Sequence, residues 1–417
     1  MPEKVYDKII IGGGAAGIMA AYSACTAGKP GNTPKVLILE ANDKAGKKIT
    51  ATGNGKCNFT NLFQEKECYR SSDSEKAFRI INKFDNIKTI ELFKNIGIPH
   101  RERNGYCYPY GEQARTFRDI FVNTVESMGV TILTEKKVRE IVRKDGQYSV
   151  FSEDGSSYAA EKLIVSCGGA AAPSFGSDGS VLKILKKMGL DILKPEPALC
   201  GLKLDFKALK RIDGVRVKCR CSLFSEKDKA PVYEESGEVI FNKKGISGIP
   251  VMNLSRFAVN LLKKEEKPEL QLDLFPDTDI GELKEYLSSV IQKSELTLGV
   301  SLSALVNDKL AGVLIEEAGL DPKRCPKDYD PAVIRKAPGV LASKFKQIKM
   351  NITDSNGFEN AQTTQGGVLL KEIDEKNMEC IKYPGMYLAG EVLDVDGMCG
   401  GYNLQWAWST GYIAGRG

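Results

Sequence analysis

A glycine pattern between an apolar run and a helical stretch constrains this chain more than any other feature. Val5–Ile11 is a short, isoleucine-rich run of the kind that forms a buried parallel strand, and Ala15–Ala27 has helical character. Between them lies the order G-x-G-x-x-G, in which missing side chains let backbone N–H groups approach a pyrophosphate at the helix N-terminus. The residues predicted to form this turn are Gly12, Gly14, Ala15, Ala16 and Gly17.

An acid at the end of the next apolar run makes the pattern more specific. Glu40 closes Val36–Leu39, about 20 residues beyond the last glycine, where a carboxylate accepts hydrogen bonds from ribose hydroxyls. Strand, glycine turn, helix, strand and acid together predict a β-α-β unit that binds a dinucleotide. The alternative, a glycine turn that serves helix packing alone, does not account for the acid.

The C-terminal part decides between FAD and NAD. A strand-like run at 386–389 ends at a glycine and an acid, and this order resembles the second motif of two-dinucleotide-fold flavoproteins, in which the acid holds the ribityl chain. NAD has no ribityl chain, so the motif favours FAD. A helix predicted at 404–414 would turn its N-terminus toward the flavin and favour the negative charge that develops on the reduced ring. The predicted contacts here are Gly390, Glu391, Gly401, Tyr402 and Asn403.

The segment 47–61 follows the ribose-binding acid and has few large apolar side chains. Such loops wrap cofactors, so we expect a lysine here to pair with phosphate and asparagines to contact the ring; solvent exposure of each side chain is the plainer alternative. The predicted contacts are Lys48, Thr52, Gly53, Asn54 and Asn58. Two further contacts are predicted, Val138 at the start of a hairpin over 138–151 and Gly168 after an apolar run at 163–165.

The length and the composition indicate several domains. A chain of 417 residues exceeds the size at which a single core stops growing. Pro195 and Pro197 mark a change to strand-like content, and helical spacing begins again near 254. We expect an α/β FAD-binding domain from 1–192 and 352–417, a β-rich inserted domain from 193–250 and 328–351, and a helical subdomain over 251–327.

Charge and cysteine usage exclude several classes of protein. The 59 basic and 54 acidic residues give a mild positive excess without a dense basic block, so nucleic-acid binding is not favoured. The 11 cysteines show no C-x-x-C pair and no zinc-like spacing, which indicates reduced thiols and no metal site. No apolar run approaches the roughly 18 residues of a membrane span. We therefore expect a cytoplasmic protein with a small-molecule substrate, and the sequence leaves the oligomeric state open.

Three segments carry a resemblance to a known family. The blocks 52–58, 245–248 and 389–409 resemble the BaiN-like flavoproteins, a bacterial family that also includes an aminoacetone oxidase. The resemblance implies FAD bound by a split Rossmann-type domain, with an inserted β-barrel-like domain and a nested helical subdomain. One departure is Lys56, where the family pattern has arginine; lysine keeps the charge and loses the planar fork.

The resemblance implies hydride transfer at flavin N5 and leaves the substrate open. Family members are associated with reduction of carbon–carbon double bonds in oxidised bile-acid intermediates and with oxidation of a small amine. A second complete G-x-G-x-x-G is absent, so NAD(P)H, if used, docks transiently over the flavin. We favour an NAD(P)H-linked reductase of a small hydrophobic, enone-like substrate over an oxygen-using amine oxidase. A flavin-dependent RNA-modifying protein and a flavin-dependent regulator without turnover rank lower.

Candidates for a proton donor are few. Tyr402 stands at the start of the last predicted helix, beside the expected flavin ring, and Tyr110 lies in a tyrosine-rich loop. For Tyr110 the alternative of aromatic packing is favoured. The only histidine, His100, lies in a charged segment and is expected to be a bystander, which removes histidine triads. Cys57 has no close cysteine partner in the sequence, so a disulfide reductase is rejected.

Overall fold

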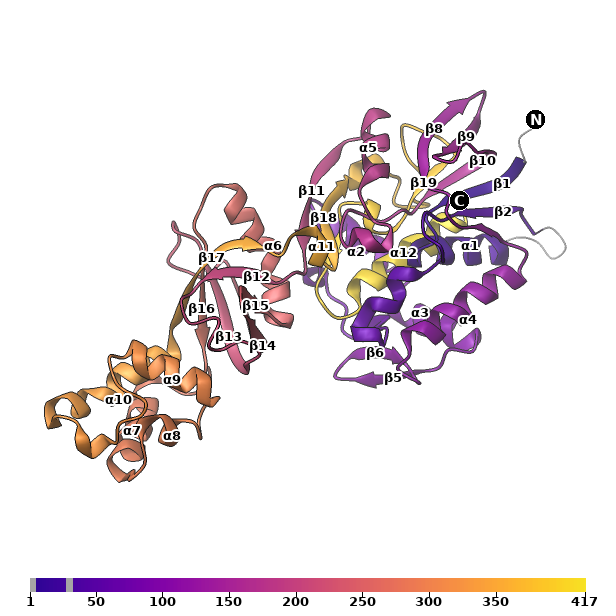
Figure 1. Cartoon of the computed structure of the whole chain (residues 1–417). Helices are drawn as coiled ribbons and strands as arrows, with labels where there is room; N and C mark the ends of the chain where they lie inside the picture. The colour runs from indigo at the N-terminus through magenta and orange to yellow at the C-terminus, as the bar shows by residue number, and fades with distance from the viewer. Residues whose placement is uncertain (1–4, 28–32) are drawn as a thin grey trace. The chain divides into compact units, whose positions relative to one another are not determined.

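The computed structural model describes residues 5–27 and 33–417. The chain divides into two compact units (Figure 1). Unit 1 comprises 1–197 and 361–417, and unit 2 comprises 198–360. Unit 1 thus combines both ends of the chain, and unit 2 is inserted between them.

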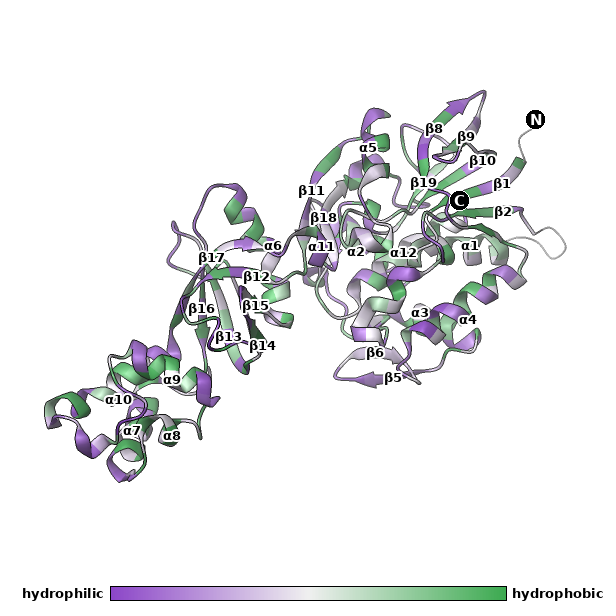
Figure 2. Ribbon diagram, viewed as in Figure 1, coloured by the Kyte–Doolittle hydropathy of each residue, from purple (hydrophilic) through white to green (hydrophobic). Residues whose placement is uncertain are grey.

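Unit 1 is built on a sheet with the strand order β7-β2-β1-β10-β9-β8, to which β19 is added by pairing with β10. β1 pairs in parallel with β2 and β10, while the hairpin β8–β9 continues the sheet antiparallel. The C-terminal strand β19 also runs parallel to β10, with Met386 opposite Leu163. The apolar central strands appear green in Figure 2. The bounds are β1 Val5–Ile11, β2 Val36–Leu39, β7 Thr131–Leu133, β8 Val138–Lys144, β9 Gln147–Ser152, β10 Ser157–Val165 and β19 Met386–Leu388.

Helix α1 (Ala15–Ala27) packs closely against α12 (Tyr402–Gly415), and Figure 1 shows them side by side. Gly411 makes this approach possible, because a Cβ there would lie 2.4 Å from the Ala16 carbonyl oxygen. The core beside α12 is aromatic: Phe93 and Trp408 meet edge-on with ring centroids 5.1 Å apart. The two ends of the chain therefore share one hydrophobic core.

The other elements of unit 1 surround this core. The segment after the 3-10 stretch Lys47–Gly55 leads into β3, which forms a three-stranded sheet with β6 and β5. The bounds are β3 Thr60–Asn61, β4 Tyr69–Arg70, α2 Ser74–Ile81, α3 Asn86–Asn95, β5 His100–Arg103, β6 Tyr106–Pro109, α4 Ala114–Ser127, α5 Ser180–Lys187, β11 Ile192–Ala198, α11 Gly357–Asn360 at the end of unit 2, β18 Thr363–Val368 and β20 Asp396–Gly397.

Unit 2 contains a closed barrel with the order β12-β15-β14-β13-β16-β17. The last strand closes the barrel on the first, with Asp354 opposite Lys203. Closure leaves no free sheet edge. Bounds of these strands are β12 Leu202–Asp205, β13 Arg216–Phe224, β14 Tyr233–Asn242, β15 Gly245–Ser247, β16 Glu269–Asp273 and β17 Ile348–Ser355.

Besides α11, five helices accompany the barrel in unit 2. Asp279 caps α7 through a capping box with Glu282, which satisfies N–H groups at the helix start. Their bounds are α6 Ile249–Lys263, α7 Ile280–Lys293, α8 Leu298–Leu302, α9 Asp308–Glu317 and α10 Pro331–Lys346. The predicted fold class, a Rossmann-type domain split by a barrel with nested helices, is confirmed. The predicted domain bounds stay a prediction, and within 328–351 the chain forms α10 before it reaches β17.

Within residues 5–27 and 33–417, no helix combines the length and the apolar character that crossing a membrane requires.

Candidate active site

The glycines of the turn after β1 have different structural roles. Gly12 has a φ of +98°, and a Cβ there would lie 2.6 Å from the Ser166 carbonyl oxygen. A Cβ at Gly17 would lie 1.9 Å from the Gly12 carbonyl oxygen, so glycine lets α1 approach the end of β1. At Gly14, a Cβ would meet no described atom within 4 Å. This free space at the N-terminus of α1 suits a pyrophosphate that approaches the backbone.

Glu40 lies directly beside the glycine turn and is 7% exposed. Its Oε2 accepts a hydrogen bond from the Gly13 N–H at 2.8 Å, and its Oε1 accepts from the backbone and side-chain amides of Asn42 at 2.8 and 2.7 Å. A carboxylate has about four acceptor positions, so it can still accept from a ribose hydroxyl. The Lys136 N–H donates to the Glu40 carbonyl at 2.8 Å, which brings the start of β8 and the buried Val138 to this end of the site.

The two distant glycine stretches meet in unit 1. Gly390 has a φ of +76°, and a Cβ there would lie 2.8 Å from Ala16 Cβ, next to Ala15 in the first turn of α1. The Trp406 Nε1 donates to the Gly390 carbonyl at 3.0 Å, and the Gly390 N–H donates to Thr410 Oγ1 at 2.9 Å. The start of the stretch 390–401 therefore packs against the first turn of α1, and the binding of one cofactor by both stretches stays a prediction.

Lys48 and Glu391 form an ion pair in this site, with Nζ 3.0 Å from Oε2. The other carboxylate oxygen of Glu391 accepts from the Thr364 N–H at 3.1 Å. Thr364 Oγ1 in turn accepts from the N–H groups of Ala170 and Ala171 at 2.8 and 2.9 Å. Within the chain the partner of Lys48 is Glu391, and the predicted contact of Lys48 with phosphate stays a prediction.

Thr364 is a site residue that the sequence reasoning missed. It lies in β18, within the order Thr-Thr-Gln-Gly-Gly, and all residues of this strand are buried. Its neighbour across the site is Gly169, where a Cβ would lie 2.4 Å from Thr364 Oγ1; Gly168, with a φ of +77°, starts the same turn. Consecutive polar residues in a buried strand were the available signal, because such groups need hydrogen-bond partners.

The loop after Lys48 bends through several left-handed residues. Thr52 is extended, while Gly53, Asn54 and Cys57 have φ values of +57°, +54° and +60°. A hydrogen bond from the Cys57 N–H to the Thr52 carbonyl, 3.0 Å long, closes the bend. Asn54 is exposed, whereas Asn58 is 8% exposed and its Oδ1 has no hydrogen-bond partner in the described chain. Burial raises the pKa of the Cys57 thiol to about 12, which makes it unreactive.

The N-terminus of α12 is fixed by its own side chains. Gly401 has a φ of +97°, and a Cβ there would lie 2.6 Å from the Thr60 carbonyl. The Asn403 Oδ1 accepts from the Gly397 N–H at 2.8 Å, and its Nδ2 donates to the Gly397 carbonyl at 2.9 Å. This amide thus holds the turn before the helix, and its predicted contact with FAD stays a prediction. The N–H groups of the first helical turn point out of the helix without intrahelical partners.

The two tyrosine candidates lie in different environments. Tyr402 is 6% exposed and packs edge-on against Tyr69, with ring centroids 5.7 Å apart. Burial, together with the neighbouring Cys68 thiol, raises the pKa of Tyr402 well above its ordinary value. Tyr110 is 60% exposed, and the Arg101 guanidinium lies 4.4 Å above its ring. These contacts favour packing roles, and the catalytic role of both tyrosines stays a prediction.

The residues present fit FAD. Asn58 Oδ1 is a buried acceptor and Gln365 Nε2 is a buried donor, and neither has a partner within the described ranges. An unsatisfied buried polar group costs about 1 to 3 kcal/mol, so both atoms are expected to meet a bound polar molecule. The pyrimidine edge of a flavin offers donors and acceptors, and the open space at Gly14 suits its pyrophosphate. No group of three or more potential metal ligands occurs in residues 5–27 and 33–417.

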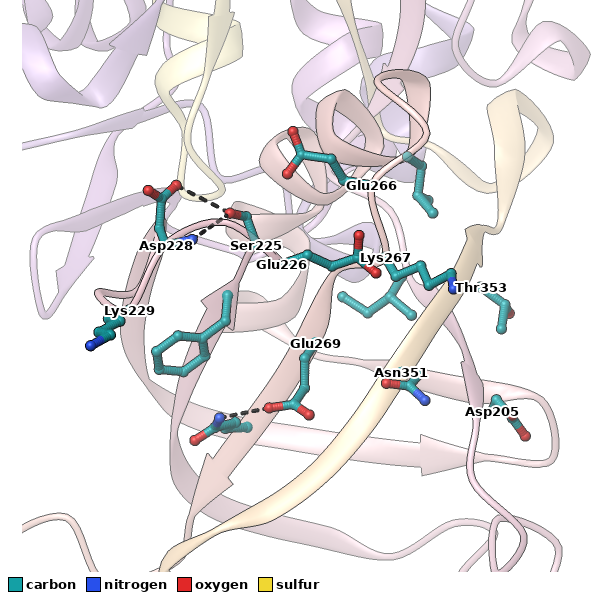
Figure 3. Close-up of a pocket in the computed structure, with 14 residues that line it drawn as sticks. Asp205, Ser225, Glu226, Asp228, Lys229, Glu266, Lys267, Glu269, Asn351 and Thr353 are labelled. Atoms are coloured by element: carbon teal, nitrogen blue, oxygen red, sulfur yellow. Dashed lines mark hydrogen bonds between the residues drawn. The ribbon is translucent and has the colours of Figure 1, made fainter.

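Unit 2 has a hollow of its own, of about 750 Å³, beside β16 and β17. Two pairs of its polar side chains are hydrogen-bonded to each other (Figure 3): Ser225 with Asp228 at 3.1 Å and Gln271 with Glu269 at 2.7 Å. Glu266, also on its wall, pairs with Lys227 at 2.9 Å. None of the side chains that line the hollow has a buried polar atom without a hydrogen-bond partner, in contrast to unit 1.

Comparison with known proteins identifies the family of this chain. The family described as HI0933-like protein Rossmann domain matches residues 6–417. A 3-dehydro-bile acid delta(4,6)-reductase of Clostridium scindens is 34% identical over 98% of this chain and 97% of its own length. A ribosomal RNA dihydrouridine synthase of Escherichia coli is 27% identical over 99% of this chain and 97% of its own length.

A solved structure shares the fold. The 3-ketosteroid delta1-dehydrogenase of Sterolibacterium denitrificans, in complex with 1,4-androstadiene-3,17-dione, has a TM-score of 0.53 at 11% identity and covers 99% of this chain and 98% of its own. With the site described above, the comparisons show an FAD-dependent oxidoreductase. The chain belongs to the HI0933-like family of Rossmann-domain proteins.

Proposed function

We propose that this protein reduces a carbon–carbon double bond conjugated to a carbonyl group in a small, apolar molecule, with NAD(P)H as the electron donor. The observation that carries this proposal is the 34% identity, over nearly both full lengths, to a 3-dehydro-bile acid delta(4,6)-reductase. The name of that relative describes reduction of double bonds in a molecule with an oxidised 3-position. All 11 cysteines are free thiols, which supports a reducing, cytoplasmic location.

Bound FAD supplies hydride acceptance and donation at N5. The chain's own residues bind and orient it: the N–H groups at the start of α1, beside Gly14, receive the pyrophosphate, and Glu40 accepts from ribose hydroxyls. Lys48 and Glu391 hold each other in an ion pair. The N-terminus of α12, after Gly401, offers partial positive charge where negative charge develops during hydride transfer.

The RNA-modifying reading has one specific observation in its favour. Two relatives, of Escherichia coli and of Haemophilus influenzae, are named ribosomal RNA dihydrouridine synthases and are 27% and 26% identical to this chain. A uracil base also contains a carbon–carbon double bond conjugated to a carbonyl, so the same hydride chemistry serves both substrates. The lower identity and the mild charge of +5 over 417 residues rank this reading second.

The deciding experiment follows the flavin absorbance of the purified holoprotein under anaerobic conditions. We expect NADPH or NADH to bleach the flavin within seconds and a 3-oxo-4-ene steroid to restore the absorbance. Bleaching by aminoacetone, with reoxidation by oxygen alone, would support the amine oxidase instead. Recovery with unmodified ribosomal RNA and not with the steroid would support the RNA-modifying reading. A Gly14→Val variant, whose side chain fills the open space at the helix start, is the FAD-free control.

A further inference from the structure

Three cations converge on one carboxylate near the start of α4. Lys56 Nζ lies 2.8 Å from Glu112 Oε2, while Arg103 Nη2 and Arg101 Nη1 lie 3.3 and 3.8 Å from Glu112 Oε1. We refer to Lys56, Arg101, Arg103 and Glu112 as the Glu112 cluster. Glu112 itself has a φ of +49°, an uncommon conformation for a residue other than glycine. The hydrogen bond from Lys56 lowers the pKa of this carboxyl.

The charges of the Glu112 cluster do not balance. Arg101 and Arg103 alternate with Glu102 along β5, so both guanidinium groups lie on one face and Glu102 lies on the other. The Glu102 carboxylate accepts a hydrogen bond from the Gly105 N–H and is engaged there. One carboxylate therefore faces three cations whose side chains are 42% to 65% exposed. An ordinary surface ion pair needs one cation for each carboxylate and contributes little, so this excess points to an additional anion.

The cluster lies beside residues that are predicted to contact the flavin. Tyr108 connects the two, because its Cε1 lies 3.6 Å from the position of a Cβ at Gly53. Burial raises the pKa of Tyr108, and the charges of Arg103 and Lys56 oppose that shift, while Cys399 adds to it. Cys399 immediately precedes the glycine turn that starts α12. The cluster is therefore near Gly53 and the start of α12, whereas the pyrophosphate of FAD belongs to the turn at Gly14.

We propose that the Glu112 cluster binds an anionic oxygen group, a phosphate or a carboxylate, of the molecule that exchanges hydride with the flavin. Guanidinium forks bind both groups in pairs of hydrogen bonds, and the lysine adds a point charge. Glu112 pairs with the three cations when no ligand is bound, and an incoming anion competes with Glu112 for these cations. The inference rests on the proposed function for the identity of the ligand, either a nicotinamide dinucleotide or an acidic enone.

Calorimetric titration of the oxidised holoprotein tests the site without turnover. The probes are NADP⁺, a 3-oxo-4-ene cholanoic acid and the methyl ester of that acid. In Arg103→Gln we expect the dissociation constant of the anionic ligand to rise about tenfold. In Glu112→Gln, which removes the competing carboxylate, we expect it to fall severalfold. Arg79→Gln is the matched control, because Arg79 is an exposed arginine that pairs with Glu375 at 2.9 Å in another part of unit 1.

Opposite shifts in the two variants support the site, since a merely structural network would weaken binding in both. Shifts confined to NADP⁺ assign the anion to the electron donor; shifts for the acid and not for its ester assign it to the substrate. Equal shifts in Arg79→Gln, unchanged dissociation constants in both variants, or no binding of either anionic probe to the wild type would overturn the proposal. Flavin bleaching of the wild type is recorded separately. If NADPH and NADH do not bleach the wild-type flavin but the two variants still shift the dissociation constants in opposite directions, the anion site is supported and NAD(P)H is rejected as the electron donor.

Discussion

Unit 1 and unit 2 differ in whether their buried polar atoms have hydrogen-bond partners. In unit 1, Asn58 Oδ1, Gln365 Nε2 and Asp394 Oδ1 are buried and have no partner, although the other carboxylate oxygen of Asp394 accepts from Ser72 Oγ at 2.6 Å. Among the described residues, no such atom is found in 198–360. A buried polar residue of unit 2, Asn253, donates to both carboxylate oxygens of Glu235 at 3.0 Å.

This difference indicates which unit is complete by itself. Natural proteins satisfy nearly all buried polar groups, and exceptions mark bound molecules or functional strain. Unit 2 satisfies its interior with its own contacts and closes its barrel, whereas unit 1 has free space at Gly14 and contains buried polar atoms without partners. We infer that the cofactor completes unit 1 and that the insert folds around its own core.

The largest expected effect tests whether the two cores are separable. Phe241→Ala removes a ring that is 1% exposed in the barrel strand β14, and Phe93→Ala removes one that is fully buried beside Trp408. Each is expected to cost about 3 to 5 kcal/mol of unfolding free energy. Urea unfolding followed by circular dichroism and by flavin absorbance should show FAD retained in Phe241→Ala and released early in Phe93→Ala. Release at the same urea concentration in both variants would contradict separate cores.

Two helical glycines, one in each unit, differ in the space that an added side chain would find. A Cβ at Gly17 would lie 1.9 Å from a backbone oxygen, whereas a Cβ at Gly312, in α9, would meet nothing within 4 Å. Gly17→Ala is expected to destabilise the apoprotein by about 3 kcal/mol, and Gly312→Ala to stabilise it by about 0.5 to 1 kcal/mol. Thermal unfolding of both apoproteins measures this. Two effects of the same sign would show that the turn after β1 can relax.

Substitution of Asn58, whose buried side-chain oxygen has no partner, is expected to have a smaller effect, which falls on FAD affinity rather than on stability. Asn58→Ala removes a buried acceptor that lacks a partner, so the apoprotein should change by less than about 0.5 kcal/mol. FAD affinity should fall about tenfold, which corresponds to about 1.4 kcal/mol. Asn86→Ala is the matched control, because the Asn86 Nδ2 donates to the carbonyls of Asn61 and Leu62 at 3.0 and 3.2 Å. It should destabilise the apoprotein by about 1 to 2 kcal/mol; the reverse pattern would remove Asn58 from the site.

The sequence predicted those parts of the molecule whose physics is local. Strand, glycine turn, helix and acid from Val5–Ile11 to Glu40 depend on neighbours in the chain, and they were predicted at the right residues. Thr364 was missed because its hydroxyl accepts from Ala170 and Ala171, which only the folded chain brings near. Barrel closure likewise depends on pairing between β12 and β17, whose separation in the sequence hides the register.

The partners in ion pairs could not be predicted from the sequence either. Lys48 was assigned to a phosphate because its loop follows the ribose-binding strand and such loops wrap cofactors, whereas Glu391 reaches it only through the C-terminal part of unit 1. Fold class was therefore accessible from short strings and from the resemblance, whereas the polar geometry of the site required long-range contacts. The identity of a proton donor depends on that geometry most of all.

Tyr402 provides the smallest and most discriminating effect. Its side chain is 6% exposed and lies against Cys68 and Tyr69, so Tyr402→Phe is expected to slow reoxidation of the reduced flavin by the enone less than about threefold. Loss of a true general acid would cost about 100-fold or more. The raised pKa also predicts the pH dependence of the rate. Because a tyrosine with a pKa above its ordinary value keeps its proton past pH 10, the wild-type rate should not fall up to that pH through ionisation of Tyr402. Stopped-flow measurement of both proteins from pH 6 to about 10 tests this. A 100-fold loss in the variant would place the hydroxyl at the reacting carbon, because packing alone survives the removal of one oxygen.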